Sequence, residues 1–298
     1  MNGLEIEMTQ PLKELIECIK KGECILFLGA GVHAPPPPGS NYLYPVEQRP
    51  LLGSELSKKL AELDYSKEFP DDLCLDLQRV SLFIETKEGL GRKTLVDYLD
   101  KYLRTDKKPS PALNMLASIP FNIFVTTNYD LLLESALSKY DKVPDRIIYN
   151  PYQNTPTPDV TEDPTEKRPL LFKMHGDLGQ RDSIVITDED YITFVQRMSD
   201  KDSLHPVPQT VRYRMLKWPT LFLGYSLHDY NLRLLFRILR WRVDKANFPT
   251  SFSVDRKPDP LIKIVYQDTE RIISFLAKDL WVFVPWLYKQ IHGKEYDV

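Results

Sequence analysis

Cysteine is scarce in this sequence. Three cysteines, Cys18, Cys24 and Cys74, occur in 298 residues, and no two of them form a Cys-x-x-Cys pair. A disulfide framework needs an even set of cysteines, and a four-cysteine zinc site needs two close pairs. The sequence therefore excludes both arrangements, and we expect neither zinc nor another metal centre.

Long apolar runs and an excess of basic charge are also missing. No segment reaches the ~18 uninterrupted apolar residues that a membrane-spanning helix needs, and residues 1–23 lack the basic start and apolar run of a signal peptide. The net charge of -3 gives no global attraction for nucleic acid, although binding through a local patch stays open. We therefore expect a cytoplasmic protein without a membrane segment.

The sequence does contain several short apolar runs that do not alternate with polar residues. Such runs are typical of strands that are buried on both faces, as in parallel sheets. They lie at residues 24–28, 122–126, 170–174, 220–224, 252–254 and 281–284. Helical patterns follow two of them, and strands that alternate with helices predict right-handed crossovers. The expected fold class is α/β, with a Rossmann-like, doubly wound and mostly parallel sheet.

Two segments depart from this alternation. Residues 51–118 carry helical periodicity and are predicted to form a helical insertion, whereas residues 150–169 contain interior prolines and are predicted to form a Pro-rich loop. A chain of 298 residues has room for one large α/β domain or for two modest domains. We expect a single catalytic domain that spans residues 1–298.

The first of four candidate motifs follows the first predicted strand. Gly29-Ala30-Gly31-Val32-His33-Ala34 satisfies G-x-G-x-x-G/A, in which the glycines let the backbone approach a pyrophosphate. The prolines at residues 35–38 cannot continue a helix at once, and the next segment is helical where a dehydrogenase would place its ribose-binding acid. An ordinary dehydrogenase is disfavoured, while a nucleotide loop and a plain tight turn both stay open.

The second and third motifs also follow predicted strands. Thr126-Thr127-Asn128-Tyr129-Asp130 opens a helix, so helix capping competes with ligand binding as its role. Lys173-Met174-His175-Gly176-Asp177 contains a histidine, which can exchange protons near neutral pH, and a glycine, which permits close approach of a ligand.

The fourth motif is GYSLHD at residues 224–229. Gly224 and Ser226 offer donors to a phosphate or a ribose, and helix capping explains Ser226 equally well. Because all four motifs lie at the exits of predicted parallel strands, they face one edge of one sheet and can converge. Three other histidines are interpreted as ordinary polar residues: His33, His205 and His292.

In this order, GAG, TTNYD, HG and GYSL resemble the successive signatures of the sirtuin-like family of NAD-dependent enzymes. The resemblance implies a sirtuin-like catalytic domain with NAD as its substrate. It implies that Asn128 positions water or ribose at the reacting carbon and that His175 bonds the ribose hydroxyls as general base. The residues that it implies for NAD binding are Gly29, Ala30, Gly31, Thr127, Asp130, Gly176, Gly224 and Ser226.

The sequence differs from the sirtuin pattern in two respects. Sirtuin deacylases carry a zinc module with two cysteine pairs, which this chain cannot build. The family's GAG is usually followed by a serine or threonine and an Asp-Phe-Arg-like loop, whereas His33 and the proline run stand here. The chain is more similar to the bacterial antiviral-defence branch. That resemblance implies cleavage of NAD to nicotinamide and ADP-ribose, and defence against phage by NAD depletion.

Other interpretations stay open. The same pocket suits NAD-dependent deacylation or ADP-ribosyl transfer to a protein, and a non-catalytic nucleotide-binding scaffold subunit is a third interpretation. The helical pattern after Asp229 motivates the third, because Arg233, Arg237 and Arg240 line one face that is either solvated or binds DNA or an acidic partner. The family resemblance also implies a homo-oligomer and a hexameric DNA-translocase-type (HerA-like) ATPase as a partner.

Overall fold

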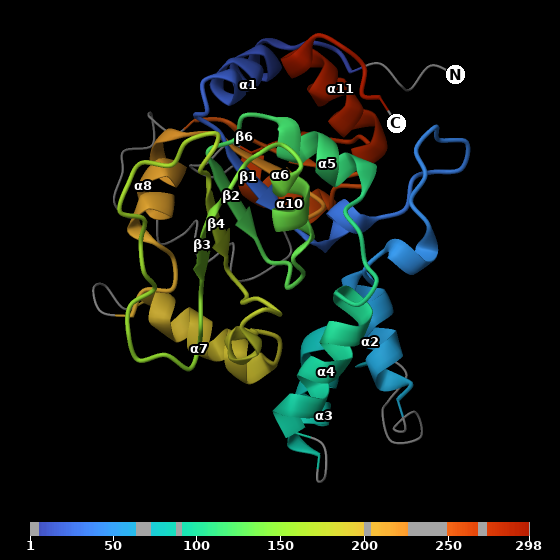
Figure 1. Ribbon diagram of the computed structural model, residues 1–298, viewed down its shortest axis with the longest axis vertical. Helices are drawn as coiled ribbons and strands as arrows, with labels where there is room; N and C mark the ends of the chain where they lie inside the picture. The colour runs from blue at the N-terminus through green and yellow to red at the C-terminus, as the bar shows by residue number, and fades with distance from the viewer. Residues whose placement is uncertain are drawn as a thin grey trace.

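A seven-stranded parallel sheet forms the centre of the molecule (Figure 1). The computed structural model describes residues 6–63, 73–87, 91–199, 204–225, 249–267 and 273–297. The strand order is β3-β4-β2-β1-β5-β6-β7, and all six neighbouring pairs are parallel. The strands are β1 Ile25–Leu28, β2 Ile123–Thr126, β3 Asp145–Ile148, β4 Leu170–Lys173, β5 Thr220–Leu223, β6 Ser251–Val254 and β7 Ile273–Leu276. The predicted Rossmann-like, doubly wound sheet is confirmed.

Helices cover both faces of this sheet. In β1, Leu26 and Leu28 belong to the core on one face, whereas Ile25 and Phe27 belong to the core on the other. Strands with two covered faces need no polar positions, which explains their unbroken apolar runs. The first face packs against α1 Gln10–Lys20, α5 Pro111–Ser118, α6 Leu132–Ser138 and α11 Leu280–His292. The second face packs against α7 Asp188–Ser199, α8 Gln209–Lys217 and α10 Pro260–Gln267.

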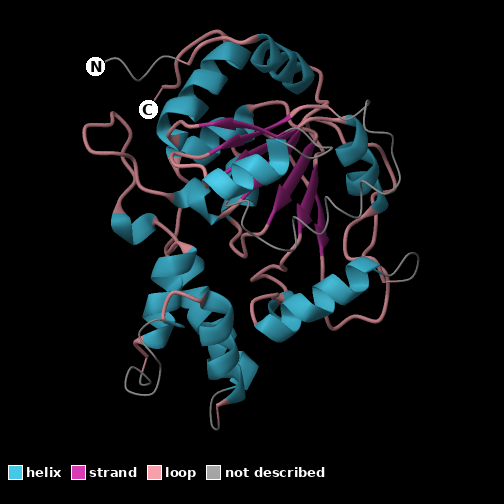
Figure 2. Ribbon diagram, turned by 180° about the vertical axis from the view of Figure 1, so that it is seen from behind, coloured by secondary structure: helices cyan, strands magenta, loops and turns pink. Residues whose placement is uncertain are grey.

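A separate group of helices lies beyond the carboxyl edge of the sheet (Figures 1 and 2). It consists of α2 Gly53–Ala61, α3 Leu77–Thr86 and α4 Gly91–Leu103. Their buried leucines, valines and isoleucines pack with Tyr129, Leu178 and Ile184, which follow β2 and β4. The same hydrophobic cluster therefore holds these helices over the ends of the strands.

One predicted strand is wrong. The run at Trp281–Val284 lies in α11, where the side chain of Asp279 caps the helix by accepting from the N–H of Trp281 at 2.7 Å. A short apolar run cannot by itself distinguish a strand from a buried helix. The sequence interpretation also missed β3 and β7, the two outer strands, and only Ile147 of β3 and Ile273 of β7 are buried there.

The described residues also include short helices and loops. Ala30–His33, Val46–Gln48 and Arg181–Ser183 form single 3-10 turns, and residues 149–169 connect β3 to β4 without a helix or strand. No helix among the described residues is long and apolar enough to cross a membrane.

Candidate functional site

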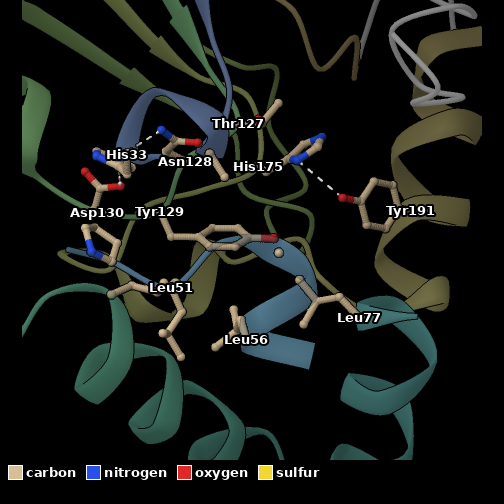
Figure 3. Close-up of a pocket in the computed structure, with 14 residues that line it drawn as sticks. His33, Leu51, Leu56, Leu77, Thr127, Asn128, Tyr129, Asp130, His175 and Tyr191 are labelled. Carbon is tan, nitrogen blue, oxygen red and sulfur yellow. Dashed lines mark hydrogen bonds and ion pairs between the residues drawn. The ribbon is translucent and has the colours of Figure 1, made fainter. Parts of the chain in front are cut away.

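A cavity lies between the carboxyl edge of the sheet and helices α2, α3 and α4 (Figure 3). The cavity has a volume of about 150 Å3, which is less than the roughly 300–1,000 Å3 that sites for whole small molecules span. The sheet and α7 contribute a mainly polar wall: Ala30, His33, Thr127, Asn128, Tyr129, Asp130, His175 and Tyr191. The opposite wall is apolar apart from one glycine backbone: Pro50, Leu51, Gly53, Leu56, Leu77 and Leu103.

Strand register brings Asn128 and His175 to the same cavity. Thr126 of β2 and Lys173 of β4 are paired in register, and the N–H of Met174 extends the ladder by donating to the carbonyl of Thr126 at 2.9 Å. Asn128 and His175 each lie two residues beyond these paired strand ends, and both line the cavity. The geometry therefore joins two motifs that are 47 positions apart in the numbering.

The backbone around Asn128 fixes the orientation of its amide. Its backbone N–H donates to Thr126 Oγ1 at 3.0 Å, and its Nδ2 donates to the carbonyl of Gly29 at 3.3 Å. A carbonyl oxygen can only accept, so the amide nitrogen must face Gly29 and the amide oxygen must face away. Asn128 Oδ1 is thereby left as an acceptor for a group in the cavity.

Asp130 is a buried carboxylate beside this amide. Its Oδ1 accepts from the N–H of Leu132 at 2.9 Å, and its Oδ2 lies 3.1 Å from His33 Nε2. Burial raises the pKa of Asp130, but the contact with His33 and the charge of Lys173 outweigh burial and hold that pKa below its ordinary value. Asp130 is therefore ionised at neutral pH and places negative charge in the cavity wall.

Packing fixes the ring of His175. The imidazole is 2% exposed, its Nδ1 lies 3.4 Å from the hydroxyl of Tyr191, and its ring packs edge-on against Tyr191 and Phe194. Gly176, which follows it, has a φ of +87°, and a Cβ there would lie 2.2 Å from the carbonyl of Ser183. Only glycine fits this turn, which directs the chain away from the site immediately after the histidine.

The glycines of the first and fourth motifs pack against each other. The N–H of Gly31 donates to the carbonyl of Gly224 at 2.8 Å, and Gly224 has a φ of +63°. A Cβ on Gly224 would lie 2.1 Å from the nitrogen of Val32, and one on Gly29 would lie 2.5 Å from the oxygen of Gly224. The loops after β1 and β5 thus touch backbone to backbone, which gives these glycines a structural role.

The expected site residues therefore fall into three groups. Those that line the cavity are Ala30, Thr127, Asn128, Asp130 and His175. Those that shape the surrounding loops are Gly29, Gly31, Gly176 and Gly224. Ser226 and the arginine-bearing helical pattern after Asp229 lie outside the described residues.

Sequence reasoning missed two polar side chains of this wall. His33 was interpreted as an ordinary polar residue, but it is 3% exposed, lines the cavity and contacts Asp130. Its place inside the GAGVHA motif was a usable signal. Tyr191 lies on α7, far from any motif in the sequence, so only the fold reveals its contact with His175.

Within the described ranges, no group of three or more histidine, cysteine, aspartate or glutamate side chains is arranged to hold a metal ion.

Comparison with known proteins identifies the family. A family model described as a SIR2-like domain matches residues 122–279. The chain is 28% identical over 259 residues to an NAD(+) hydrolase ThsA of Enterococcus faecium, covering 87% of this chain and 48% of that protein. It is 25% identical to a ThsA of Acinetobacter baumannii, with coverages of 79% and 43%. It is 24% identical to defense-associated sirtuin 2 of Bacillus subtilis, with coverages of 99% and 26%. The chain thus spans less than half the length of these curated relatives.

Proposed function

Because this chain belongs to the SIR2-like domain family, we propose that it hydrolyses NAD to nicotinamide and ADP-ribose and serves bacterial defence against phage by depleting NAD. The names of the relatives, NAD(+) hydrolase and defense-associated sirtuin, support both parts of this proposal. The proposal treats residues 1–298 as a single sirtuin-like catalytic domain, with the helical insertion at about residues 51–118 and the Pro-rich loop at about residues 150–169.

The observation that carries the proposal is the shared cavity of Asn128 and His175. Asn128 presents an amide oxygen whose orientation is set by Gly29, and His175 presents a buried imidazole from the neighbouring strand end. An acceptor and an imidazole on one wall suit the binding of a water molecule and a sugar hydroxyl.

The reaction requires the C–N bond between ribose and nicotinamide to break. The bonding electron pair leaves with nicotinamide, which carries a positive charge in NAD and becomes neutral. The ribose carbon then develops oxocarbenium-like positive charge, water adds its oxygen to that carbon, and a proton is released. We propose that Asn128 orients the water. We propose that His175 binds the ribose hydroxyls and acts as general base. Positioning of the reacting groups and electrostatic stabilisation of the developing charge contribute most to the rate of such a step.

The charge of the cavity wall suits this transition state. Asp130 is ionised and buried, and Lys173, the cation that acts on it, does not itself line the cavity. A fixed negative charge next to a developing cation stabilises it most where water is excluded. The opposite wall, formed by Leu51, Leu56 and Leu77, is apolar.

The rest of the NAD molecule is assigned to the loops after β1, β2 and β5. The strand order reverses between β1 and β5, and ligands of open α/β sheets bind outside the strand ends at this switch point. We propose that Thr127 and Asp130 hold the nicotinamide end together with Ala30, and that the backbone of the glycine-rich loops faces the diphosphate and adenosine. The NAD-binding set is Gly29, Ala30, Gly31, Thr127, Asp130, Gly176, Gly224 and Ser226.

Location and assembly complete the proposal. We expect action in the cytoplasm, as a homo-oligomer, with a hexameric DNA-translocase-type (HerA-like) ATPase as a partner. The location rests on composition, and both assembly statements rest on family resemblance.

Incubation of the purified protein with NAD alone tests the proposal. Chromatography should detect nicotinamide and ADP-ribose in equal amounts, and the measurement is repeated after addition of the product of the neighbouring gene. Nicotinamide release only when an acylated peptide or a protein acceptor is added would instead assign deacylation or ADP-ribosyl transfer. NAD binding without any release, in the presence of the partner as well, would assign a scaffold role.

A further inference from the structure

His33 stands between the two polar groups that matter most to the proposed reaction. Its Nε2 lies 3.1 Å from Asp130 Oδ2 and 3.4 Å from Asn128 Nδ2. Dashed lines mark contacts between these residues in Figure 3. The three residues come from the loops after β1 and β2, and His33 and Asp130 are both buried. We propose that His33 is a positioning residue, which occupies the carboxylate of Asp130 and thereby keeps the Asn128 amide turned toward Gly29; this rests on the proposed function.

The two contacts of Nε2 cannot both be hydrogen bonds in the same state. A ring nitrogen that carries a proton donates to Asp130 and cannot accept from Asn128. A ring nitrogen without a proton accepts from Asn128, and Asp130 must then be protonated to face it. The protonation states of the pair therefore decide which contact is bonded.

The ionised carboxylate of Asp130 favours the state in which His33 Nε2 carries a proton. Its carboxylate is ionised, so it needs a donor, and His33 Nε2 is the side-chain nitrogen within hydrogen-bond distance of its Oδ2. His33 Nδ1 is buried and has no hydrogen-bond partner among the described residues. A buried N–H without an acceptor costs about 1–3 kcal/mol, which disfavours a proton on Nδ1. His33 therefore donates to Asp130 Oδ2 through the proton on Nε2.

The hydrogen bond from His33 to Asp130 determines which acceptor the Asn128 amide uses. With Asp130 Oδ2 occupied by His33, the acceptor left for Asn128 Nδ2 is the carbonyl of Gly29 at 3.3 Å. If His33 could not donate, the ionised carboxylate would be a stronger acceptor than that carbonyl, and charged acceptors form the stronger hydrogen bonds. The amide would rotate toward Asp130, and Oδ1 would lose its direction into the cavity.

Substitutions at residue 33 separate positioning from simple packing. His33→Gln can place an N–H donor at nearly the reach of Nε2, whereas His33→Leu fills a similar space without a donor. We expect His33→Leu to lower kcat for NAD hydrolysis about tenfold to a hundredfold, because small misplacements of a reacting group cost about that much. We expect KM to change less than about twofold, and His33→Gln to recover most of the loss.

Two spectroscopic readouts test the arrangement without relying on activity. Long-range 1H–15N spectra of 15N-labelled protein at neutral pH should show His33 protonated on Nε2, with its signals identified by their absence in His33→Gln. The side-chain amide resonances of Asn128 should move in His33→Leu and return toward their original position in His33→Gln. The sequence has five histidines, so overlap is small.

The outcomes are distinct. A native protein in which His33 Nε2 carries no proton, or Asn128 amide resonances unmoved in a folded His33→Leu variant, would overturn the proposal. Equal loss of kcat in folded Gln and Leu variants would also overturn it. A native protein that fails to hydrolyse NAD, but shows the expected His33 proton and Asn128 response, would reject the proposed function and leave the arrangement of the three residues intact.

Discussion

Lys173 Nζ and Asp177 Oδ2 lie 2.7 Å apart, and both side chains are at most 1% exposed. The same ammonium donates to the backbone carbonyl of Asp130 and lies 3.4 Å from Glu134 Oε1. Burial raises the pKa of Glu134 in spite of the nearby lysine charge. Lys173 therefore ties the loop that carries His175 to the loop that carries Asn128 and Asp130.

Replacement of Lys173 by methionine should destabilise the fold strongly. It leaves the buried carboxylate of Asp177 without its cation, and breaking a buried pair in this way costs about 3–5 kcal/mol. Urea denaturation followed by circular dichroism measures the loss. Lys139→Met is the matched control, because Lys139 is exposed and surface changes usually cost less than ~0.5 kcal/mol. Equal stability of the two variants would show that the buried pair does not hold these loops.

The central strands could be anticipated from residue pattern alone. Apolar runs such as Cys24–Leu28 identify strands covered on both faces, and glycines or polar residues directly after them identify the edge where a site can form. The outer strands gave no such signal, because Asp145–Ile148 has one buried residue, two partly buried residues and one exposed residue. Local pattern therefore predicts buried strands and loses exposed ones.

The sequence predicted only those site residues that lie in loops directly after strands. Asn128 and His175 could be paired because both follow strands that were predicted to be parallel. The contact of Tyr191 with His175 depends on how α7 packs across the sheet, and the leucine wall depends on how α2 and α3 fold over its edge. Those placements come from tertiary packing, which no spacing within the sequence encodes.

Alanine substitution of the two assigned catalytic residues should abolish NAD loss. Asn128→Ala removes the acceptor that orients water, and His175→Ala removes the imidazole, so each should lower the rate of nicotinamide release at least about 100-fold. His292→Ala is the control, since His292 lies on α11 beside Ser118, away from the cavity. Retained hydrolysis in folded Asn128→Ala and His175→Ala proteins would remove the mechanism.

Gly224 offers a test of the contact between the first and fourth motifs. A Cβ there would lie 2.1 Å from the nitrogen of Val32, whereas a Cβ on Gly39 would meet no atom within 4 Å. Both glycines have positive φ, +63° and +81°, so alanine costs a similar ~1–2 kcal/mol of backbone strain at each. Gly224→Ala should cost several kcal/mol more in thermal or urea unfolding. NAD affinity, measured by calorimetry, should fall only in that variant. Equal effects at the two positions would show that the motifs do not need this close contact.

Asp190 anchors the helical group to the sheet domain. Its Oδ2 accepts from the N–H groups of Ile186 and Thr187 at 2.9 and 3.0 Å and pairs with Arg92 of α4 at 2.8 Å. Burial raises the pKa of Asp190, but the two N–H groups and the guanidinium outweigh burial, so this pKa lies below its ordinary value. The carboxylate therefore stabilises the folded protein only while it is ionised.

The sign of the resulting pH dependence follows from linkage. An unfolded aspartate binds its proton near pH ~3.9, and the folded one binds it at lower pH, so the stabilisation is complete above that value and is lost as the pH falls toward the folded pKa. Asp190→Asn should lower the free energy of unfolding by about 2–4 kcal/mol near neutral pH. The difference from the native protein should shrink as the pH falls below ~3.9 toward the folded pKa. Glu189→Gln, an exposed acid on the same helical turn, controls for the loss of one charge. A difference between native protein and Asp190→Asn that stays constant over this pH range would contradict the assigned role of the ion pair with Arg92.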